Sequence, residues 1–152
     1  MSITASGLYG LTLEKFLNVT SLPASGLESE TAVKILMVVD AETPDFNADN
    51  FRDDVTANEV SGTGYTAGGV VITSTEITLS GGVLTYDSAD PSWAASTITS
   101  AMAAVGYFGR GGADTADELM WLSDFISPAS SSSGLFTIQV AAAGWWTVDF
   151  TP

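Results

Sequence analysis

The run Ala-Val-Lys-Ile-Leu-Met-Val-Val at residues 32–39 restricts the fold of this chain more than any other segment. It is rich in branched side chains, and every position after Lys34 is apolar, so both faces of an extended segment would be hydrophobic. Such a run is typical of a strand that is covered on both sides of its sheet. We therefore expect residues 32–39 to form the central strand of the fold.

Further β-prone segments follow this run. Residues 70–79 alternate imperfectly, but β-branched residues dominate and a strand is expected there. Ser80-Gly81-Gly82 then leads directly into residues 83–86, which predicts a hairpin. Trp93 is expected in the core after a turn. Between the strands at 32–39 and 70–79, the acidic residues 40–57 are predicted to form an ordered excursion with one helical turn around 51–55, followed by extended residues 59–61.

The last third of the chain also favours strands. The Ala and Met content of residues 97–108 would allow a helix, but the following aromatic pair and glycine-rich loop favour a strand. Residues 118–126, which contain Trp121, are expected to be extended. Residues 135–140 and 145–150 are joined by a short Ala-Gly segment, and we predict that they form a closing hairpin.

These segments predict one mainly β domain over residues 1–152, an antiparallel β-sandwich or barrel of about seven or eight short strands. The N-terminal part differs. Across residues 8–17, one face repeats apolar side chains at helical spacing, which predicts a short helix that begins at Ser6 or Gly7. Residues 1–31 would then form an N-terminal segment made of this helix and a loop.

Composition excludes several classes of function. The chain has no His and no Cys, which removes imidazole bases, thiolate nucleophiles, thiolate zinc sites and disulfides. Four Lys and Arg against eighteen Asp and Glu give a formal charge of −14, which disfavours nucleic acid and anionic membranes as partners. Since the N-terminus resembles no signal peptide and no apolar run is long enough to span a bilayer, we expect synthesis in a cytoplasm.

One acidic stretch resembles the beginning of a calcium-binding loop. Asp45, Asn47 and Asp49 alternate as the oxygen ligands of such loops do. The pattern fails later, because Asn50 stands where glycine is needed and Thr56 where the final glutamate is needed. A looser calcium site at these three residues stays open, but we favour the alternative that Asx side chains accept hydrogen bonds from nearby backbone N–H groups.

Other motifs carry little chemistry. Residues 62–67 fit a G-x-G-x-x-A pattern, but β-prone residues follow where a dinucleotide site needs a helix, so we expect a turn and no cofactor. Paired carboxylates could catalyse glycoside hydrolysis, yet close pairs are expected in a chain with eighteen acids. We therefore predict no catalytic residues and no enzymatic activity.

Four residues are candidates for contact with another protein. Trp145 and Trp146 are adjacent, so in a strand one ring would face the core and the other would need a cover, for which a partner chain is the preferred source. Tyr65 lies in a glycine-rich turn cluster. Arg110, one of four cations, could anchor an acidic partner patch, although a solvated loop arginine is an equal alternative.

One long stretch resembles a known family. The segment Asn-Glu-Val-Ser-Gly-Thr-Gly-Tyr-Thr-Ala-Gly-Gly at residues 58–69 is its most specific part, and the similarity extends over residues 33–79. A Trp-centred segment near Trp93, the Ser-Asp-Phe sequence at 123–125 and the segment 136–150 are similar too. On these residues the chain resembles a family of small virion proteins of tailed bacteriophages. Residues 101–118 and the serine-rich loop depart from it.

The resemblance implies a structural component of the virion, expected to be a decoration (cement) protein on the capsid exterior. Its partners would be the major capsid protein and further copies of itself, with a trimer as one arrangement. Two alternatives stay open. One is a receptor- or carbohydrate-binding module of a tail or fibre, and the other is a head-tail connector component.

Overall fold

The computed structural model describes residues 3–11, 26–28 and 31–151, and within them the chain is mainly β. Ten strands and three short 3-10 helices occur in these residues, and all strand pairs are antiparallel. They form a five-stranded, a three-stranded and a two-stranded sheet. The prediction of a mainly β, antiparallel fold is thus confirmed, with ten strands in place of the seven or eight expected.

The five-stranded sheet is the centre of the fold. Its order is β1 (Gly7–Leu8), β8 (Leu119–Ala129), β7 (Ala101–Phe108), β2 (Val33–Val39) and β3 (Val70–Val71). Strand β2 is almost completely buried, so the prediction of a central strand covered on both faces is confirmed. Leu36 and Val38 belong to one core cluster, while Ile35 and Met37 belong to the other.

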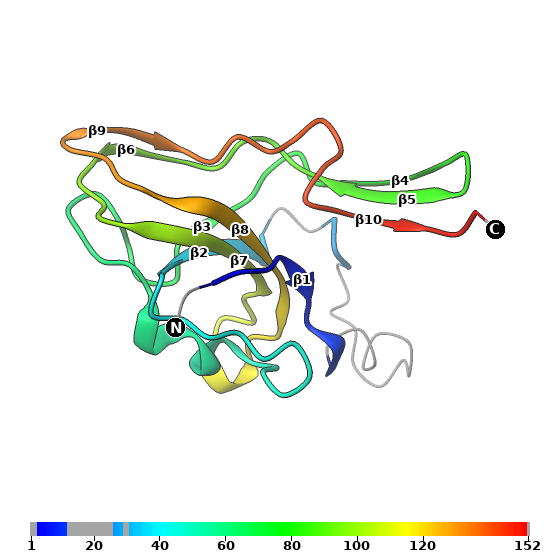
Figure 1. Cartoon of the computed structure of the whole chain (residues 1–152), viewed down its shortest axis with the longest axis horizontal. Helices are drawn as coiled ribbons and strands as arrows, with labels where there is room; N and C mark the ends of the chain where they lie inside the picture. Colours follow the sequence, from blue (N-terminus) through cyan, green and yellow to red (C-terminus); the bar gives the residue numbers. More distant parts are fainter. Residues whose placement is uncertain (1–2, 12–25, 29–30, 152) are drawn as a thin grey trace.

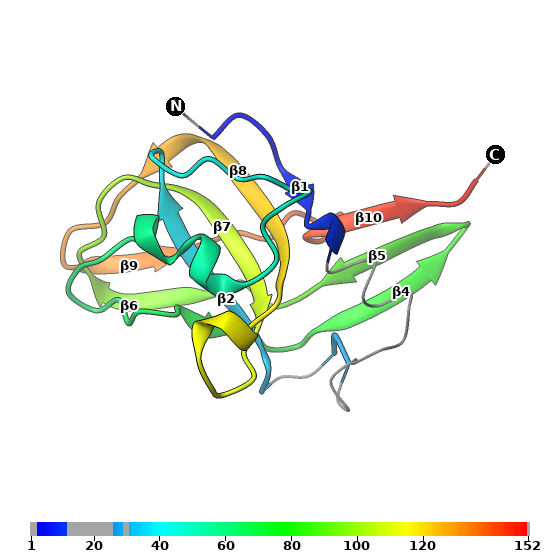
Figure 2. The same cartoon turned by 90° about the horizontal axis from the view of Figure 1, so that it is seen from below.

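Different elements cover the two faces (Figures 1 and 2). Strands β6 (Ser92–Ser96) and β9 (Gly134–Thr137) pair and lie over one face, where Trp93 and Phe136 enter the core. The loop with the 3-10 helices η1 (Arg52–Asp54) and η2 (Thr56–Asn58) lies at the other face, beside η3 (Asp114–Ala116). The predicted helical turn near residues 51–55 and the buried Trp93 are therefore both present.

Residues 97–108 form a strand from Ala101 onward, as favoured over a helix. All eight residues of β7 are buried, and small side chains let it pack closely against β8. The tightest place is Gly106, where an added Cβ would lie 2.4 Å from ring atoms of Trp121. Since Trp121 is itself buried, the glycine provides the space that the indole occupies.

The predicted closing hairpin is wrong. Strand β9 pairs with β6, whereas β10 (Trp146–Asp149) pairs with β5 (Val83–Asp87), which belongs to another sheet. The connection turns at residues 141–144, and Trp145 N–H then donates to Tyr86 O at 2.8 Å. The bend carries two tryptophans to aromatic neighbours in the core, and that burial outweighs pairing with the nearest strand in sequence.

Two other boundaries differ from expectation. Residues 70–79 do not form one strand, because the chain leaves the central sheet after β3 and places Ile72 in the core. It then turns at Ser74, which has a positive φ of 53°, and begins β4 (Glu76–Ser80) in the three-stranded sheet. The β4–β5 hairpin at Gly81-Gly82 is as predicted. The N-terminal helix is not shown: Gly7–Leu8 pair with β8 as β1, and residues 12–17 lie outside the described residues.

Replacing Gly106 with alanine tests the packing of β7 on β8. The added methyl group would overlap the buried Trp121 ring, so we expect the free energy of unfolding to fall by about 1–3 kcal/mol. Chemical denaturation measures the change. Gly112→Ala is the control, because a Cβ there has no atom within 4 Å; equal stability of both variants would contradict the packing described.

Candidate interaction surface

The three-stranded sheet of β4, β5 and β10, here called the arm, has one apolar face. Residues opposite each other across an antiparallel sheet share a face, as do residues two apart along a strand. The register therefore places two apolar rows on one side. The inner row is Ile77, Tyr86 and Trp146, and the outer row is Leu79, Leu84 and Val148.

The inner row joins the arm to the core through aromatic contacts. The Tyr86 ring is fully buried, stacks on Trp146 at a centroid distance of 5.5 Å, and meets the edge of Trp121 at 5.3 Å. Its hydroxyl donates to Leu27 O at 3.0 Å, and burial raises its pKa. Trp145 contacts Trp121 at 5.6 Å and donates from Nε1 to Ser88 Oγ. The base of the arm is therefore tightly packed.

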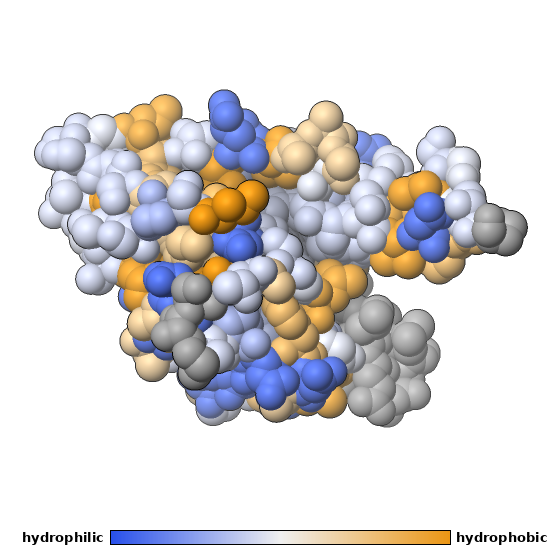
Figure 3. All heavy atoms as spheres, viewed as in Figure 1, coloured by the Kyte–Doolittle hydropathy of each residue, from blue (hydrophilic) through white to orange (hydrophobic). Residues whose placement is uncertain are grey.

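The outer row is not packed in this way. The arm extends away from the rest of the molecule in both views, with the chain's C-terminal end beside its tip (Figures 1 and 2). Leu79 is 67% exposed and Phe150, two residues beyond Val148, is 64% exposed. Hydrophobic surface lies on the arm next to a hydrophilic patch (Figure 3). We call Leu79, Leu84, Val148 and Phe150 the apolar stripe.

The opposite face of the arm is polar and acidic. Thr78, Thr85 and Thr147 pair across the strands, one residue along from each apolar row, and their side chains therefore point to this opposite face. Asp149 is exposed, and its pKa is lowered because the Thr151 hydroxyl and backbone N–H donate to it at 2.6 and 2.8 Å. The arm thus has an apolar stripe on one face and polar residues on the other, and exposed apolar patches rimmed by polar residues mark sites where proteins bind other proteins.

The two tryptophans predicted as interface residues both lie at the base of the arm. Trp145 precedes β10, so the strand alternation expected of the pair does not apply. Both rings are half-buried and pack against the core, and they line a hollow of about 230 Å³ together with Leu8, Trp121 and Leu122. The hydrogen of Trp146 Nε1 is buried without a partner.

Tyr65 and Arg110 make contacts inside the chain. The Tyr65 hydroxyl donates to Glu59 Oε1 at 2.7 Å and accepts from Met37 N–H, while its ring stacks on Trp93. Arg110 forms a two-bond ion pair with Glu118, at 2.7 Å from Nε and 2.6 Å from Nη2. Neither of the two alternatives stated for Arg110 included this pairing.

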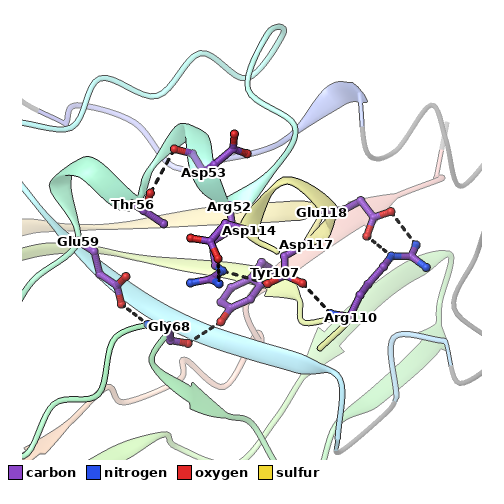
Figure 4. Close-up of polar contacts among 10 residues, drawn as sticks. All are labelled: Arg52, Asp53, Thr56, Glu59, Gly68, Tyr107, Arg110, Asp114, Asp117 and Glu118. Atoms are coloured by element: carbon purple, nitrogen blue, oxygen red, sulfur yellow. Dashed lines mark hydrogen bonds and ion pairs between the residues drawn. The ribbon is translucent and has the colours of Figure 1, made fainter. Parts of the chain in front are cut away.

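Arg110 belongs to a polar network at one end of the central sheet (Figure 4), and Tyr65 joins it through Glu59, which also accepts from Gly68 N–H. Arg52 lies over the Tyr107 ring, donates from Nε to Asp117 Oδ2 at 3.0 Å and pairs with Asp114. Asp117 also accepts from Arg110 N–H at 2.7 Å. The Tyr107 hydroxyl donates to Gly68 O, so the network connects η1, η3 and the glycine-rich turn. These contacts hold the three segments against one another.

The acidic stretch satisfies its own backbone. Asp45 Oδ1 accepts from Asn47 N–H and Ala48 N–H, and Asp49 Oδ2 accepts from Asp45 N–H. This is the Asx alternative favoured from the sequence. Across residues 3–11, 26–28 and 31–151, no three or more acidic side chains gather in a way that could hold a metal ion.

A buried carboxyl lies beside this stretch. Glu42 is 3% exposed and accepts a hydrogen bond from Asn58 Nδ2 at 2.9 Å. Burial raises its pKa above the ordinary value of 4.5, and the charges of Asp49 and Asp54 act in the same direction. Burial also raises the pKa of Asp49. The folded chain therefore keeps negative charge here at a cost in free energy.

Comparison of the chain with protein-family models, with curated proteins and with solved structures finds no match. In the part of the chain that the structure describes, no helix is long and apolar enough to cross a membrane.

Replacing Asp117 with alanine tests the polar network. Asp117 has a side chain only 6% exposed and binds both arginines, so its removal leaves Arg52 without its Nε partner in a nearly buried position. We expect a loss of about 3 kcal/mol in the free energy of unfolding, measured by chemical denaturation. Asp53→Ala, which lies in η1 beside Arg52 but is exposed, is the control. A loss as small as that of the control would contradict a stabilising network.

Replacing Glu42 with glutamine tests the buried charge. A raised folded-state pKa means that the native state binds protons more readily than the unfolded state, so stability falls as pH rises above the unfolded value. Glutamine can still accept from Asn58 but carries no charge. We expect higher stability than wild type at neutral pH and a difference that shrinks on acidification toward the unfolded pKa, both measured by urea denaturation. A lower stability at neutral pH would contradict this.

Proposed function

We propose that this protein is a non-enzymatic structural component of a tailed-bacteriophage particle, a decoration (cement) protein that binds the outside of the capsid shell. The resemblance in residues 33–79 supports the virion assignment. The observation that carries the proposal is the apolar stripe on the arm, because the same face is packed at its base and open at its tip. A partner that covers this stripe would bury the outer apolar row, as the core of the chain already buries the inner row.

Physical properties of the chain agree with this role. Covering a leucine or phenylalanine stabilises a complex by about 1.5–3 kcal/mol per side chain. A symmetric shell offers many equivalent sites, and a protein that binds only the assembled shell stabilises it by mass action. A charge of −14 keeps unbound copies apart in the host cytoplasm and away from the packaged genome.

We further propose that the three sheets together form a β-sandwich. In it the β6–β9 pair and the base of the arm cover one face of the central sheet. In this arrangement the central sheet holds the fold and the arm is left for contact. We propose that the arm meets the major capsid protein, with further copies of the chain around it.

Binding to phage heads that lack the protein tests the proposal. Wild type should bind in many copies over the shell and raise the resistance of the heads to heat. Leu79→Ser combined with Val148→Ser should weaken binding by at least about tenfold, because two apolar contacts are lost. The copy number per particle and a heat-inactivation curve are the two measurements.

Thr78→Ser combined with Thr147→Ser is the matched control, since these residues lie on the same strands but on the polar face. It should bind as wild type does. Location of the protein at the tail or fibre tips, or a few copies confined to the neck, would contradict the proposal and favour the receptor-binding or connector alternative.

A further inference from the structure

Ile126 in strand β8 has an unusual combination of conformation and exposure. Its φ is +68°, in the left-handed region that glycine and asparagine favour and that a β-branched side chain adopts only under strain. The side chain is 86% exposed, the largest value among the exposed large hydrophobic residues described. A strained backbone position and an uncovered isoleucine occur here in one residue.

A bulge holds this residue in place. Asp124 lies opposite Ala103 and Ala129 lies opposite Ala101, so residues 125–128 face only Met102 on the neighbouring strand. Asp124 Oδ1 accepts from Ile126 N–H at 2.7 Å, and Asp124 N–H donates to Ser6 Oγ at 2.8 Å. These bonds fix the backbone on the N-terminal side of the bulge.

Side chains on either side of Ile126 are anchored differently from it. Phe125 and Ala129 are partly buried and pack against the core. They also line a hollow of about 210 Å³ with Phe136 and Ile138. The bulge therefore presents Ile126 outward on a backbone that is already ordered, while its neighbour Phe125 turns inward.

The described fold gives no reason for isoleucine at this position. Glycine would remove the strain, and a polar residue would suit the exposure. Strain that the surrounding structure maintains is concentrated at sites of binding and function. An anchor that is ordered before binding also loses little conformational entropy on association. An isoleucine at position 126 is explained if another molecule covers its side chain.

Charge selects the class of partner. Asp124 lies two residues away, and the chain carries −14 in total. Two of its four cations, Arg52 and Arg110, are engaged with carboxylates of the same chain. A second copy would bring the same excess of negative charge, whereas a surface with lysine or arginine around an apolar pocket is complementary.

We propose that Ile126 is a preformed anchor that inserts into an apolar pocket rimmed by Lys or Arg on a partner protein. It is a second contact, on the central sheet, separate from the apolar stripe on the arm. Two contacts on one rigid chain increase the apparent affinity through effective concentration. The inference depends on the proposed function only for the identity of the partner, which we take to be the capsid shell.

The test compares stability and binding in the same variants. Ile126→Gly relieves the positive φ, so its melting temperature should equal or exceed that of wild type. Its affinity for phage heads that lack the protein should nevertheless fall at least about tenfold, the loss expected for one apolar anchor. Ser133→Gly is the matched control, because it relieves a positive φ of 49° at another exposed residue and should leave binding unchanged.

Salt tests the chemistry of the partner. Binding of wild type should weaken as sodium chloride is raised, because it screens the cationic rim. The following outcomes would contradict the proposal. Equal binding of Ile126→Gly, a lower melting temperature of that variant, or self-association that the variant abolishes would overturn the anchor. Failure of wild type itself to bind the heads would instead overturn the proposed function and, with it, the shell as partner.

Discussion

The indole of Trp121 connects the central sheet to the arm, and the rest of the architecture depends on that contact. The ring lies on Gly106 of β7, meets the edge of Tyr86 in β5 and contacts Trp145 before β10. Strands of two sheets are thus positioned by one buried side chain and one missing Cβ. Because the inner row of the arm is held here, the outer row is presented on a fixed support instead of a loose hairpin.

The local sequence predicts those parts of the fold whose structure is determined by residues close together in the chain. The apolar run in β2 and the paired glycines between β4 and β5 are examples, and both are confirmed. The closing hairpin fails because proximity in sequence favoured pairing of β9 with β10, while the tryptophans at residues 145 and 146 reach aromatic partners only in another sheet. Long-range burial of that kind has no signature in a single segment.

The same limit applies to the candidate surface. The apolar stripe becomes visible only when β10 is paired with β5, since Val148 and Leu84 are far apart in sequence. The sequence indicates one part of this stripe, because Ile77 and Leu79 alternate with polar residues in β4 and would therefore share one face of a strand. The positive φ of Ile126 has no such signal. Conversely, Tyr65 and Arg110 looked available in sequence, yet nearby carboxylates bind both.

The bulge in β8 also has a mechanical consequence. Residues 125–128 have no one-to-one neighbours in β7, yet β8 pairs with β7 again at its last residue, Ala129. A pull on Ile126 is therefore shared between backbone pairs on both sides of the bulge. A tip at the end of a hairpin would peel open one bond at a time. The proposed contact at Ile126 would therefore place its load in the middle of a paired strand.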